Sequence, residues 1–142
     1  MGLHYTIHAD GASRGNPGPA AGGAVALETE SGRLALELAV LVGVASNNVA
    51  EYRGMIAAVR AVREHLDPSA VTIKMDSKLV VEQMSGRWKV KHPDMRDLVK
   101  EAWSVIDTLP VEFLWIPRED NHLADRMGNL ALDQGTDHFR LH

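Results

Sequence analysis

The sequence predicts an α/β protein with a five-stranded mixed sheet and helices on both faces. Residues 3–43 contain three segments with the strand period, joined by turns, which favours antiparallel neighbours. Two later strand-like segments, residues 70–75 and 111–116, each follow a segment with helical periodicity, which favours parallel pairing through crossovers. No repeat, linker or low-complexity segment divides residues 1–142, so we expect a single domain.

The first three strands are expected near the N-terminus. Apolar and polar residues alternate over residues 3–10, the pattern of a half-buried strand. The Gly/Pro-rich residues 11–23 are expected to form a turn that leads into a second strand over residues 24–30. Ser31-Gly32 then favours a hairpin turn before a third strand over residues 33–43.

The first helix is expected after Asn47 and Asn48, either of which can cap its N-terminus. Its apolar residues recur at helical spacing: Val49, Tyr52, Met55, Ile56, Val59 and Val62. Asp67-Pro68 is expected to end this helix.

Strands and helices are expected to alternate in the rest of the chain. The strand over residues 70–75 leads to a short helix that Asp76 or Ser77 can cap. The later expected elements are the connection GRWKVKHP, a helix over residues 93–109, a strand over 111–116 and a helix over 121–132. Trp103 and Trp115 are expected in the core, and residues 134–142 are expected to form a flexible tail without a clear pattern.

Composition narrows the class of protein. The chain has 142 residues, a formal net charge of −4 and no cysteine, so disulfides, thiolate nucleophiles and cysteine-ligated zinc are excluded. No apolar run approaches the roughly 18 residues that a membrane span needs. The N-terminus also lacks the apolar stretch of a secretory signal. We therefore expect a cytoplasmic monomer without a membrane partner.

Four acidic residues suggest the chemistry: Asp10, Glu51, Asp76 and Asp125. Each lies at the border of an expected strand or helix, and ligands of open α/β sheets gather beyond the carboxyl ends of strands. Carboxylates gathered there repel one another unless cations lie among them, and oxygen ligands suit Mg²⁺ or Mn²⁺. Two such ions, roughly 4 Å apart, are the machinery of in-line phosphodiester cleavage. The pattern therefore indicates a metal-dependent nuclease.

Three of these acids also have purely structural interpretations. Asp10 precedes Gly11, a common turn pair. Asp76 can act as an N-cap, and Glu51 can be a favourable charge in the first turn of a helix. Single positions do not separate these alternatives from metal ligation, whereas the combined pattern favours ligation.

The order of four motifs resembles the type 1 ribonuclease H family over nearly the whole chain. The motifs are DGASRGNPGPAAGG, SNNVAEYRGM, KMDSKLVVEQMSG and PREDNHLADRMGN. The resemblance implies a ribonuclease H-like fold and an endoribonuclease that hydrolyses the RNA strand of RNA–DNA hybrids, leaving 5′-phosphate and 3′-hydroxyl ends. It also implies two Mg²⁺ ions, which Mn²⁺ can replace, held by Asp10, Glu51, Asp76 and Asp125.

The loop before Asp125 is short and offers Arg118 where many bacterial members have a longer loop with a histidine. In this respect the sequence resembles the compact, archaeal-type subgroup, in which an arginine at this point takes part in catalysis. Arg118 is therefore expected to contact the scissile phosphate or to assist product release. Its alternative is an exposed pair with Glu119 or Asp120, and His122 is a weaker candidate for proton transfer.

Substrate contacts are expected from several segments. Gly11 and Asn16 lie in the Gly-rich segment, where the backbone can approach RNA closely. By resemblance, Ser46 is expected to contact a DNA phosphate, Asn47 an RNA 2′-hydroxyl, and Asn48 a base edge or sugar. A contact to a 2′-hydroxyl is how a protein distinguishes RNA from DNA.

Two further sets of residues are expected at the substrate. The basic connection can hold the DNA backbone and offer one aromatic ring through Arg87, Trp88, Lys89, Lys91 and His92. Its alternative is a solvated loop with Trp88 packed beneath it. Asn121 precedes Asp125 by one helical turn, as Asn47 precedes Glu51, and is also expected at the substrate, with a solvated helix start as the alternative.

Three other functions compete with the hybrid-specific nuclease. A relative that acts on DNA keeps the fold, but SNNVAEYRGM favours RNA contacts. A catalytically silent hybrid-binding module retains the motifs without turnover. A phosphatase with Asp10 as nucleophile would normally carry a second aspartate where Ala12 stands.

Overall fold

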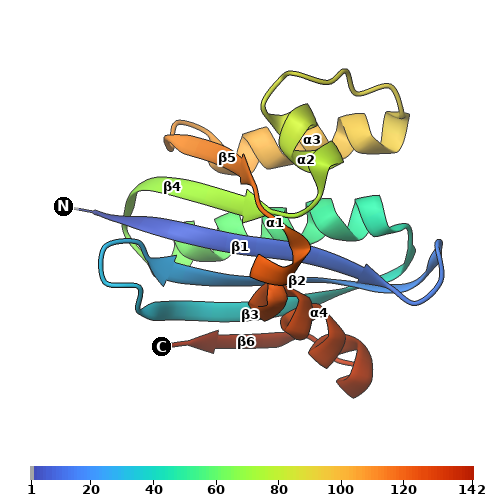
Figure 1. The fold of residues 1–142 in the computed structure, drawn as a ribbon, viewed down its shortest axis with the longest axis horizontal. Helices are drawn as coiled ribbons and strands as arrows, with labels where there is room; N and C mark the ends of the chain where they lie inside the picture. Colours follow the sequence, from blue (N-terminus) through green and yellow to red (C-terminus); the bar gives the residue numbers. More distant parts are fainter. Residues whose placement is uncertain (1) are drawn as a thin grey trace.

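A six-stranded mixed sheet forms the centre of the protein in this computed structural model, which describes residues 2–142 (Figure 1). The strands are β1 (Leu3–Ser13), β2 (Gly18–Glu28), β3 (Leu34–Ala45), β4 (Pro68–Met75), β5 (Val111–Trp115) and β6 (His138–Leu141). The helices are α1 (Asn47–His65), α2 (Lys78–Met84), α3 (Pro93–Ile106), the short 3₁₀ turn η1 (Arg118–Asp120) and α4 (His122–Gln134).

The strand order across the sheet is β5-β4-β1-β2-β3-β6. The neighbours β1, β2 and β3 pair antiparallel, whereas β4 pairs parallel with both β1 and β5. This confirms the predicted mixed sheet, because the hairpin-linked strands are antiparallel and the strands reached through helices are parallel. The parallel pair β1 and β4 brings the carboxyl ends of two central strands side by side.

The predicted number of strands is wrong, because β6 adds a sixth strand antiparallel to β3. Residues 138–141 are therefore not part of a patternless tail. Backbone pairing and polar contacts fix the segment, including Asp137, whose carboxylate accepts from the amide of Leu41 at 2.7 Å. Phe139 and Leu141 are about half exposed, so β6 lacks the buried alternation by which a strand is recognised in a sequence.

The predicted turn over residues 11–23 is also wrong, since β1 extends to Ser13 and β2 begins at Gly18. Gly11, Gly18, Gly22 and Gly23 lie in the strands, and helices cross β2 at Gly22 and Gly23 at very short range. A Cβ on Gly22 would lie 2.4 Å from the amide nitrogen of Gly54 in α1. A Cβ on Gly23 would lie 2.4 Å from the carbonyl oxygen of Ala124 in α4. Small residues here let the two helices approach β2.

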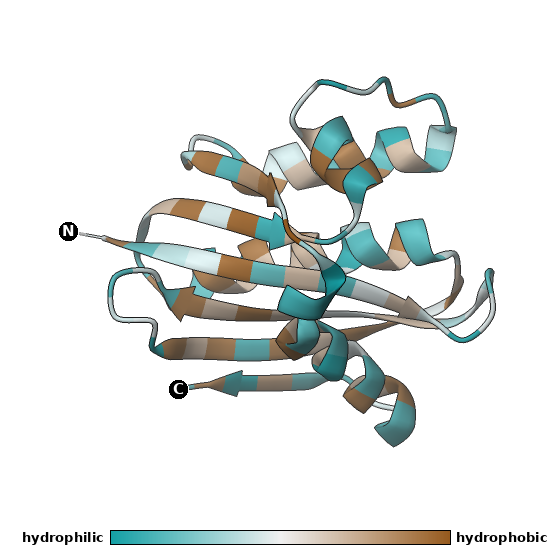
Figure 2. Cartoon of the chain, viewed as in Figure 1, coloured by the Kyte–Doolittle hydropathy of each residue, from teal (hydrophilic) through white to brown (hydrophobic). Residues whose placement is uncertain are grey.

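Helices cover both faces of the sheet, as predicted. The main core lies between the sheet and α1 with α3, and includes Ile7, Tyr52 and Ile73. A smaller core lies under α4, with Val25 and Ala131 among its members. Figure 2 shows hydrophobic residues alternating with hydrophilic ones along the strands. Within residues 2–142, no helix is long and apolar enough to cross a membrane.

The two tryptophans predicted to be in the core lie at the surface. Trp103 on α3 is 45% exposed and Trp115 at the end of β5 is 48% exposed. β5 is an edge strand, so no further strand covers the ring of Trp115, and Trp103 lines the hollow between α2, α3 and β5. Trp103 packs edge-on against Phe113, with ring centroids 6.3 Å apart.

Candidate active site

Three of the four predicted acids converge at the carboxyl end of β1 and β4. Asp10 lies within β1, Asp76 directly follows β4, and Glu51 lies in the first turns of α1. One carboxylate oxygen from each residue lies within 4.8 Å of one from each of the others. The parallel pairing of β1 with β4 and the crossing of α1 over β1 together produce this acidic triad of Asp10, Glu51 and Asp76.

A glycine sets the distance between α1 and β1. A Cβ on Gly11 would lie 2.3 Å from the amide nitrogen of Glu51, far inside contact distance. A Cβ on Gly54, one turn further along α1, would lie 2.6 Å from the carbonyl oxygen of Asp10. Gly11 also donates its amide hydrogen to Oδ1 of Asp10 at 2.9 Å. The structure thus gives Gly11 a packing role, while its expected contact to substrate stays a prediction.

The acidic triad is electrostatically unfavourable when all three residues are ionised. Asp10 is only 6% exposed. Burial, the charge of Asp76 and that of Asp125 raise the pKa of Asp10 to about 7. Burial and the charges of Asp10 and Asp76 raise the pKa of Glu51 still further. The carboxyl groups of Asp10 and Glu51 therefore resist ionisation unless a cation lies among the acids of the triad.

The acidic triad fits a divalent cation. Within residues 2–142, Oε2 of Glu51 is buried and has no hydrogen-bond partner, although a buried acceptor normally has one. All the converging donor atoms are carboxylate oxygens, which hard cations such as Mg²⁺ and Mn²⁺ prefer. A cation would provide the missing partner of Glu51 and would remove the charge repulsion, so the residues present can hold a metal.

Two neighbouring side chains donate hydrogen bonds to Asp76, one to its carboxylate and one to its backbone carbonyl. Nδ2 of Asn121 donates to Oδ1 of Asp76 at 2.8 Å, and Nε1 of Trp115 donates to the backbone carbonyl of Asp76 at 3.2 Å. Ser77 caps α2 by accepting from the amide of Val80, so the carboxylate of Asp76 is not used as the cap. The sequence did not predict the contact from Trp115, because this contact depends on the pairing of β5 with β4.

Asp125 lies beside the acidic triad and outside it. It lies on α4, and Nδ2 of Asn129 donates to its backbone carbonyl at 3.0 Å and to its Oδ1 at 3.3 Å. Its charge still acts on Asp10, because it contributes to raising the pKa of that carboxyl group. Asp125 also lines a small cavity of about 320 Å³ together with Arg118, Glu119 and His122. The structure thus brings the predicted Arg118, His122 and Asp125 to one place.

A groove brings together half of the predicted substrate-binding residues. It has a volume of about 870 Å³ and lies between the start of α1, the connection after α2 and the start of α3. Five predicted residues line this groove, called the basic groove below: Ser46, Asn48, Lys89, Lys91 and His92. Lys89, Lys91 and His92 are exposed on the connection after α2, whereas Asp94, Asp97 and Glu101 line the α3 side of the same groove. An anionic ligand would therefore be received at the connection rather than along the whole groove.

The start of α1 is organised differently from the prediction. Ser46, rather than Asn47 or Asn48, caps the helix by accepting from the amide of Val49 at 3.3 Å. Oδ1 of Asn16 accepts from the backbone amide of Asn47 at 3.2 Å, which ties the β1–β2 turn to the helix. The exposed side chains of Asn47 and Asn48 are therefore not needed for capping.

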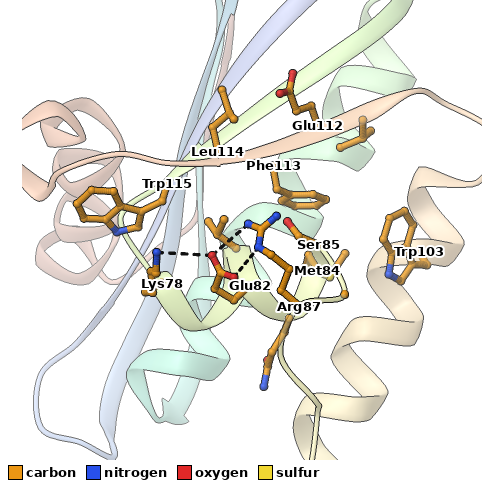
Figure 3. Close-up of a pocket in the computed structure, with 14 residues that line it drawn as sticks. Lys78, Glu82, Met84, Ser85, Arg87, Trp103, Glu112, Phe113, Leu114 and Trp115 are labelled. Atoms are coloured by element: carbon orange, nitrogen blue, oxygen red, sulfur yellow. Dashed lines mark hydrogen bonds and ion pairs between the residues drawn. The ribbon is translucent and has the colours of Figure 1, made fainter.

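Arg87 and Trp88 do not line the basic groove. Arg87 instead donates from Nε to Glu82 at 2.6 Å and from Nη2 at 3.0 Å, while Nζ of Lys78 lies 3.6 Å from the same carboxylate. These contacts lie in a separate hollow of about 730 Å³ between α2, α3 and β5 (Figure 3). Trp88 is 45% exposed, so it is not packed beneath the loop.

The fold and the acidic triad define a ribonuclease H-like α/β domain. A family described as "Reverse transcriptase-like" matches residues 8–131. The chain therefore belongs to this family and, within it, to the ribonuclease H1 group, as the following relatives show.

Two curated relatives are similar to nearly the whole of this chain. The chain is 49% identical over 133 residues to the bifunctional protein Rv2228c of Mycobacterium tuberculosis, covering 92% of this chain and 36% of that protein. It is 39% identical over 132 residues to ribonuclease HI of Halobacterium salinarum, covering 89% of this chain and 64% of that protein. The chain thus spans about a third of the first relative and under two thirds of the second.

Solved structures of similar proteins have the same fold. The N-terminal RNase H domain of Rv2228c superposes with a TM-score of 0.86 at 46% identity, covering 93% of this chain and 95% of that chain. LC11-RNase H1, solved in complex with an RNA/DNA hybrid, superposes with a TM-score of 0.86 at 35% identity, covering 92% of this chain and 98% of that chain. The family uses divalent metal, and the acidic triad is the place in this chain that can hold it.

Proposed function

We propose that this domain is an endoribonuclease that hydrolyses the RNA strand of RNA–DNA hybrids and leaves 5′-phosphate and 3′-hydroxyl ends. The observation that carries the proposal is the acidic triad, in which burial and charge crowding oppose ionisation unless cations bind. The RNA/DNA hybrid bound by a protein 35% identical to this chain supports the choice of substrate.

We propose that Asp10, Glu51, Asp76 and Asp125 hold two Mg²⁺ ions, for which Mn²⁺ can substitute. Two such ions supply an activated water and stabilise charge on the leaving 3′-oxygen. The chain's own contribution is to fix the carboxylates at the end of β1, β4 and the start of α1, so that little reorganisation is needed when substrate arrives. Asp125, outside the acidic triad, is assigned the more open side of the site.

Cationic and polar residues around the acidic triad have separate tasks in this proposal. Arg118, in the cavity that Asp125 lines, contacts the scissile phosphate or assists product release. His122, in the same cavity, is a weaker candidate for proton transfer. Asn47 and Asn48 recognise the RNA 2′-hydroxyl and a base edge or sugar, because a 2′-hydroxyl contact separates RNA from DNA.

The basic groove binds the DNA strand of the hybrid in this proposal. Ser46 contacts a phosphate, and Lys89, Lys91 and His92 neutralise the backbone, which provides affinity without sequence preference. Asn16, in the β1–β2 turn, accepts from the backbone amide of Asn47 and so supports the RNA contacts at the start of α1. A cytoplasmic location and a monomeric state stay predictions, which fractionation and sedimentation would check.

Cleavage of a hybrid labelled on its RNA strand tests the proposal. Single-stranded RNA, double-stranded RNA and DNA duplex run beside it, with Mg²⁺, Mn²⁺ or EDTA, and Asp76→Asn is the matched inactive variant. The expected result is metal-dependent cleavage of the hybrid that the variant loses. Binding of the hybrid without cleavage would favour a silent binding module, and cleavage of DNA would contradict the proposed substrate.

A further inference from the structure

A buried residue, Asn121, donates a short side-chain hydrogen bond to the acidic triad. Asn121 is 1% exposed, although the residue that follows it, His122, is exposed. Its Nδ2 lies 2.8 Å from Oδ1 of Asp76 and 2.9 Å from the carbonyl oxygen of Ala9. The carboxamide therefore lies beneath the site and points at a carboxylate of the acidic triad.

Both hydrogens of the Asn121 amide are used on acceptors. The two partners, Oδ1 of Asp76 and the carbonyl oxygen of Ala9, cannot donate, so the NH₂ group and not the oxygen must face them. With this orientation, Oδ1 of Asn121 is buried and makes no hydrogen bond of ordinary geometry within residues 2–142. The side chain of His8 is nevertheless close enough that Asn121 raises its pKa, although burial lowers the pKa of His8 overall. The two hydrogen bonds donated by the NH₂ group therefore fix the orientation of the carboxamide.

One acceptor lies in β1 and the other lies directly after β4. Ala9 immediately precedes Asp10 in β1, and Asp76 immediately follows β4. Asn121 itself is the residue before α4 and does not cap that helix with its side chain. Its carboxamide thus joins the ends of β1 and β4 to the helix that carries Asp125.

We propose that Asn121 is a positioning residue that sets the orientation of the Asp76 carboxylate for cation binding, rather than a residue that contacts the substrate. With Oδ1 of Asp76 held by Asn121, the carboxylate presents its remaining acceptor capacity toward Asp10 and Glu51. Without the donor, the side chain of Asp76 is free to rotate about its χ angles. This inference rests on the proposal that the acidic triad holds divalent cations.

The test is Mn²⁺ affinity of the protein without nucleic acid, measured by isothermal titration for wild type, Asn121→Ala and Asn121→Leu. Leucine keeps the branched shape and the number of heavy atoms of asparagine, with bulkier methyl groups, and removes the donor, so it controls for a cavity. Loss of a hydrogen bond to a metal ligand typically weakens metal binding about 10–100-fold, and we expect this range for both variants. At saturating Mn²⁺, the KM for the hybrid should change less than about twofold, because outer-sphere partners act on the metal.

The opposite pattern would overturn the inference. If Asn121 contacts the substrate, Mn²⁺ affinity stays at the wild-type value and the KM for the hybrid rises. Should both variants fail to fold, the side-chain amide resonance of Asn121 in the wild-type protein is compared by NMR with that in Asp76→Asn. A large shift supports the contact, and an unchanged resonance contradicts it.

Failure of the proposed function would give a different result. If the wild-type protein binds Mn²⁺, loses affinity on Asn121→Leu and yet does not cleave the hybrid, the positioning role stands and the nuclease proposal falls. If the wild-type protein cleaves the hybrid and Asn121→Leu has wild-type Mn²⁺ affinity, the nuclease proposal stands and the positioning role falls.

Discussion

The acidic triad and the basic groove differ in how the fold builds them. The acidic triad lies at the ends of two central strands and the first turns of α1, where glycines fix backbone distances to within contact range. The basic groove is lined partly by an exposed connection and by the start of α3. The proposed chemistry, which needs carboxylates within a few ångströms, would therefore rest on the packed core, whereas the proposed binding surface rests on an exposed connection.

The largest expected effect is that of Asp10→Asn. Removing one carboxylate from the acidic triad should reduce hybrid cleavage by roughly 10³-fold or more, because electrostatic groups of this kind dominate catalysis. The metal-free variant should nevertheless be at least as stable as the wild-type protein, since a crowded buried carboxyl group is removed. Thermal melting in EDTA checks the second point, and a clear fall in the melting temperature would contradict it.

The same residue gives a prediction about pH. The pKa of Asp10 rises from 3.8 to about 7 on folding, so between these values the folded state binds more protons than the unfolded state. The stabilisation is therefore complete below pH 3.8 and is lost as the pH rises through about 7. In EDTA, the melting temperature of Asp10→Asn minus that of the wild type should increase from pH 5 to pH 8. A difference that is constant with pH would show that Asp10 is not strained.

A substitution that leaves the charge of the protein unchanged should also disturb the geometry of the acidic triad. Gly11→Ala places a Cβ where the α1 backbone lies 2.3 Å away, so α1 must move and Glu51 must move with it. We expect at least about a 10-fold loss of cleavage, because small misplacements of a catalytic group are costly. Gly128→Ala is the matched control, since its Cβ would meet its neighbours at ordinary distances of 3.6 Å or more. Equal activities of the two variants would remove the positioning argument for Gly11.

Changes in the basic groove should act on binding instead. The double variant Lys89→Ala and Lys91→Ala should weaken hybrid binding, and should reduce the slope of log K against log[salt] by about 1–2, as expected for two lost phosphate contacts. Cleavage at saturating hybrid should change little. Lys100→Ala, on an exposed position of α3 that does not line the groove, is the control. Identical salt slopes for all three proteins would exclude the groove from the substrate site.

Among the single substitutions expected to reduce cleavage, Arg118→Ala is expected to have the smallest effect, and to act on turnover more than on binding. Arg118 lines the cavity beside Asp125 but is exposed, and exposed charges contribute modestly. We expect kcat to fall about 10-fold, while KM changes less than about threefold. Arg126 is likewise exposed but lies on α4, so Arg126→Ala is the control and should retain wild-type kcat. A wild-type kcat for Arg118→Ala would assign Arg118 to the solvated surface.

The sequence predicted the acidic triad more fully than the groove. Asp10 and Asp76 end strand patterns, and parallel strands place such residues together, so their convergence follows from the pattern. Glu51 joins the other two acids because α1 crosses β1 at Gly11. The sequence shows a glycine at this position, but it does not show that α1 packs against it. Arg87 was grouped with the basic residues, yet Glu82, five residues earlier, binds it in another hollow.

Contacts between distant segments account for most of what was not predicted. β6 is fixed by backbone pairing with β3, and Trp115 contacts Asp76 only because β5 pairs with β4. Asn121 was expected at the substrate because it precedes Asp125 by one helical turn. Its burial and its contact to Asp76, 45 residues away in the chain, depend on tertiary packing that periodicity does not encode.

Proton release on cation binding tests most directly whether the acidic triad holds divalent metal. Titration of the metal-free protein with Mn²⁺ by calorimetry near pH 7, in two buffers of different ionisation enthalpy, counts the protons displaced. Because the pKa values of Asp10 and Glu51 are raised, we predict binding with release of about one proton or more, and loss of both in Asp10→Asn. Binding without proton release, or equal binding by the variant, would contradict the account.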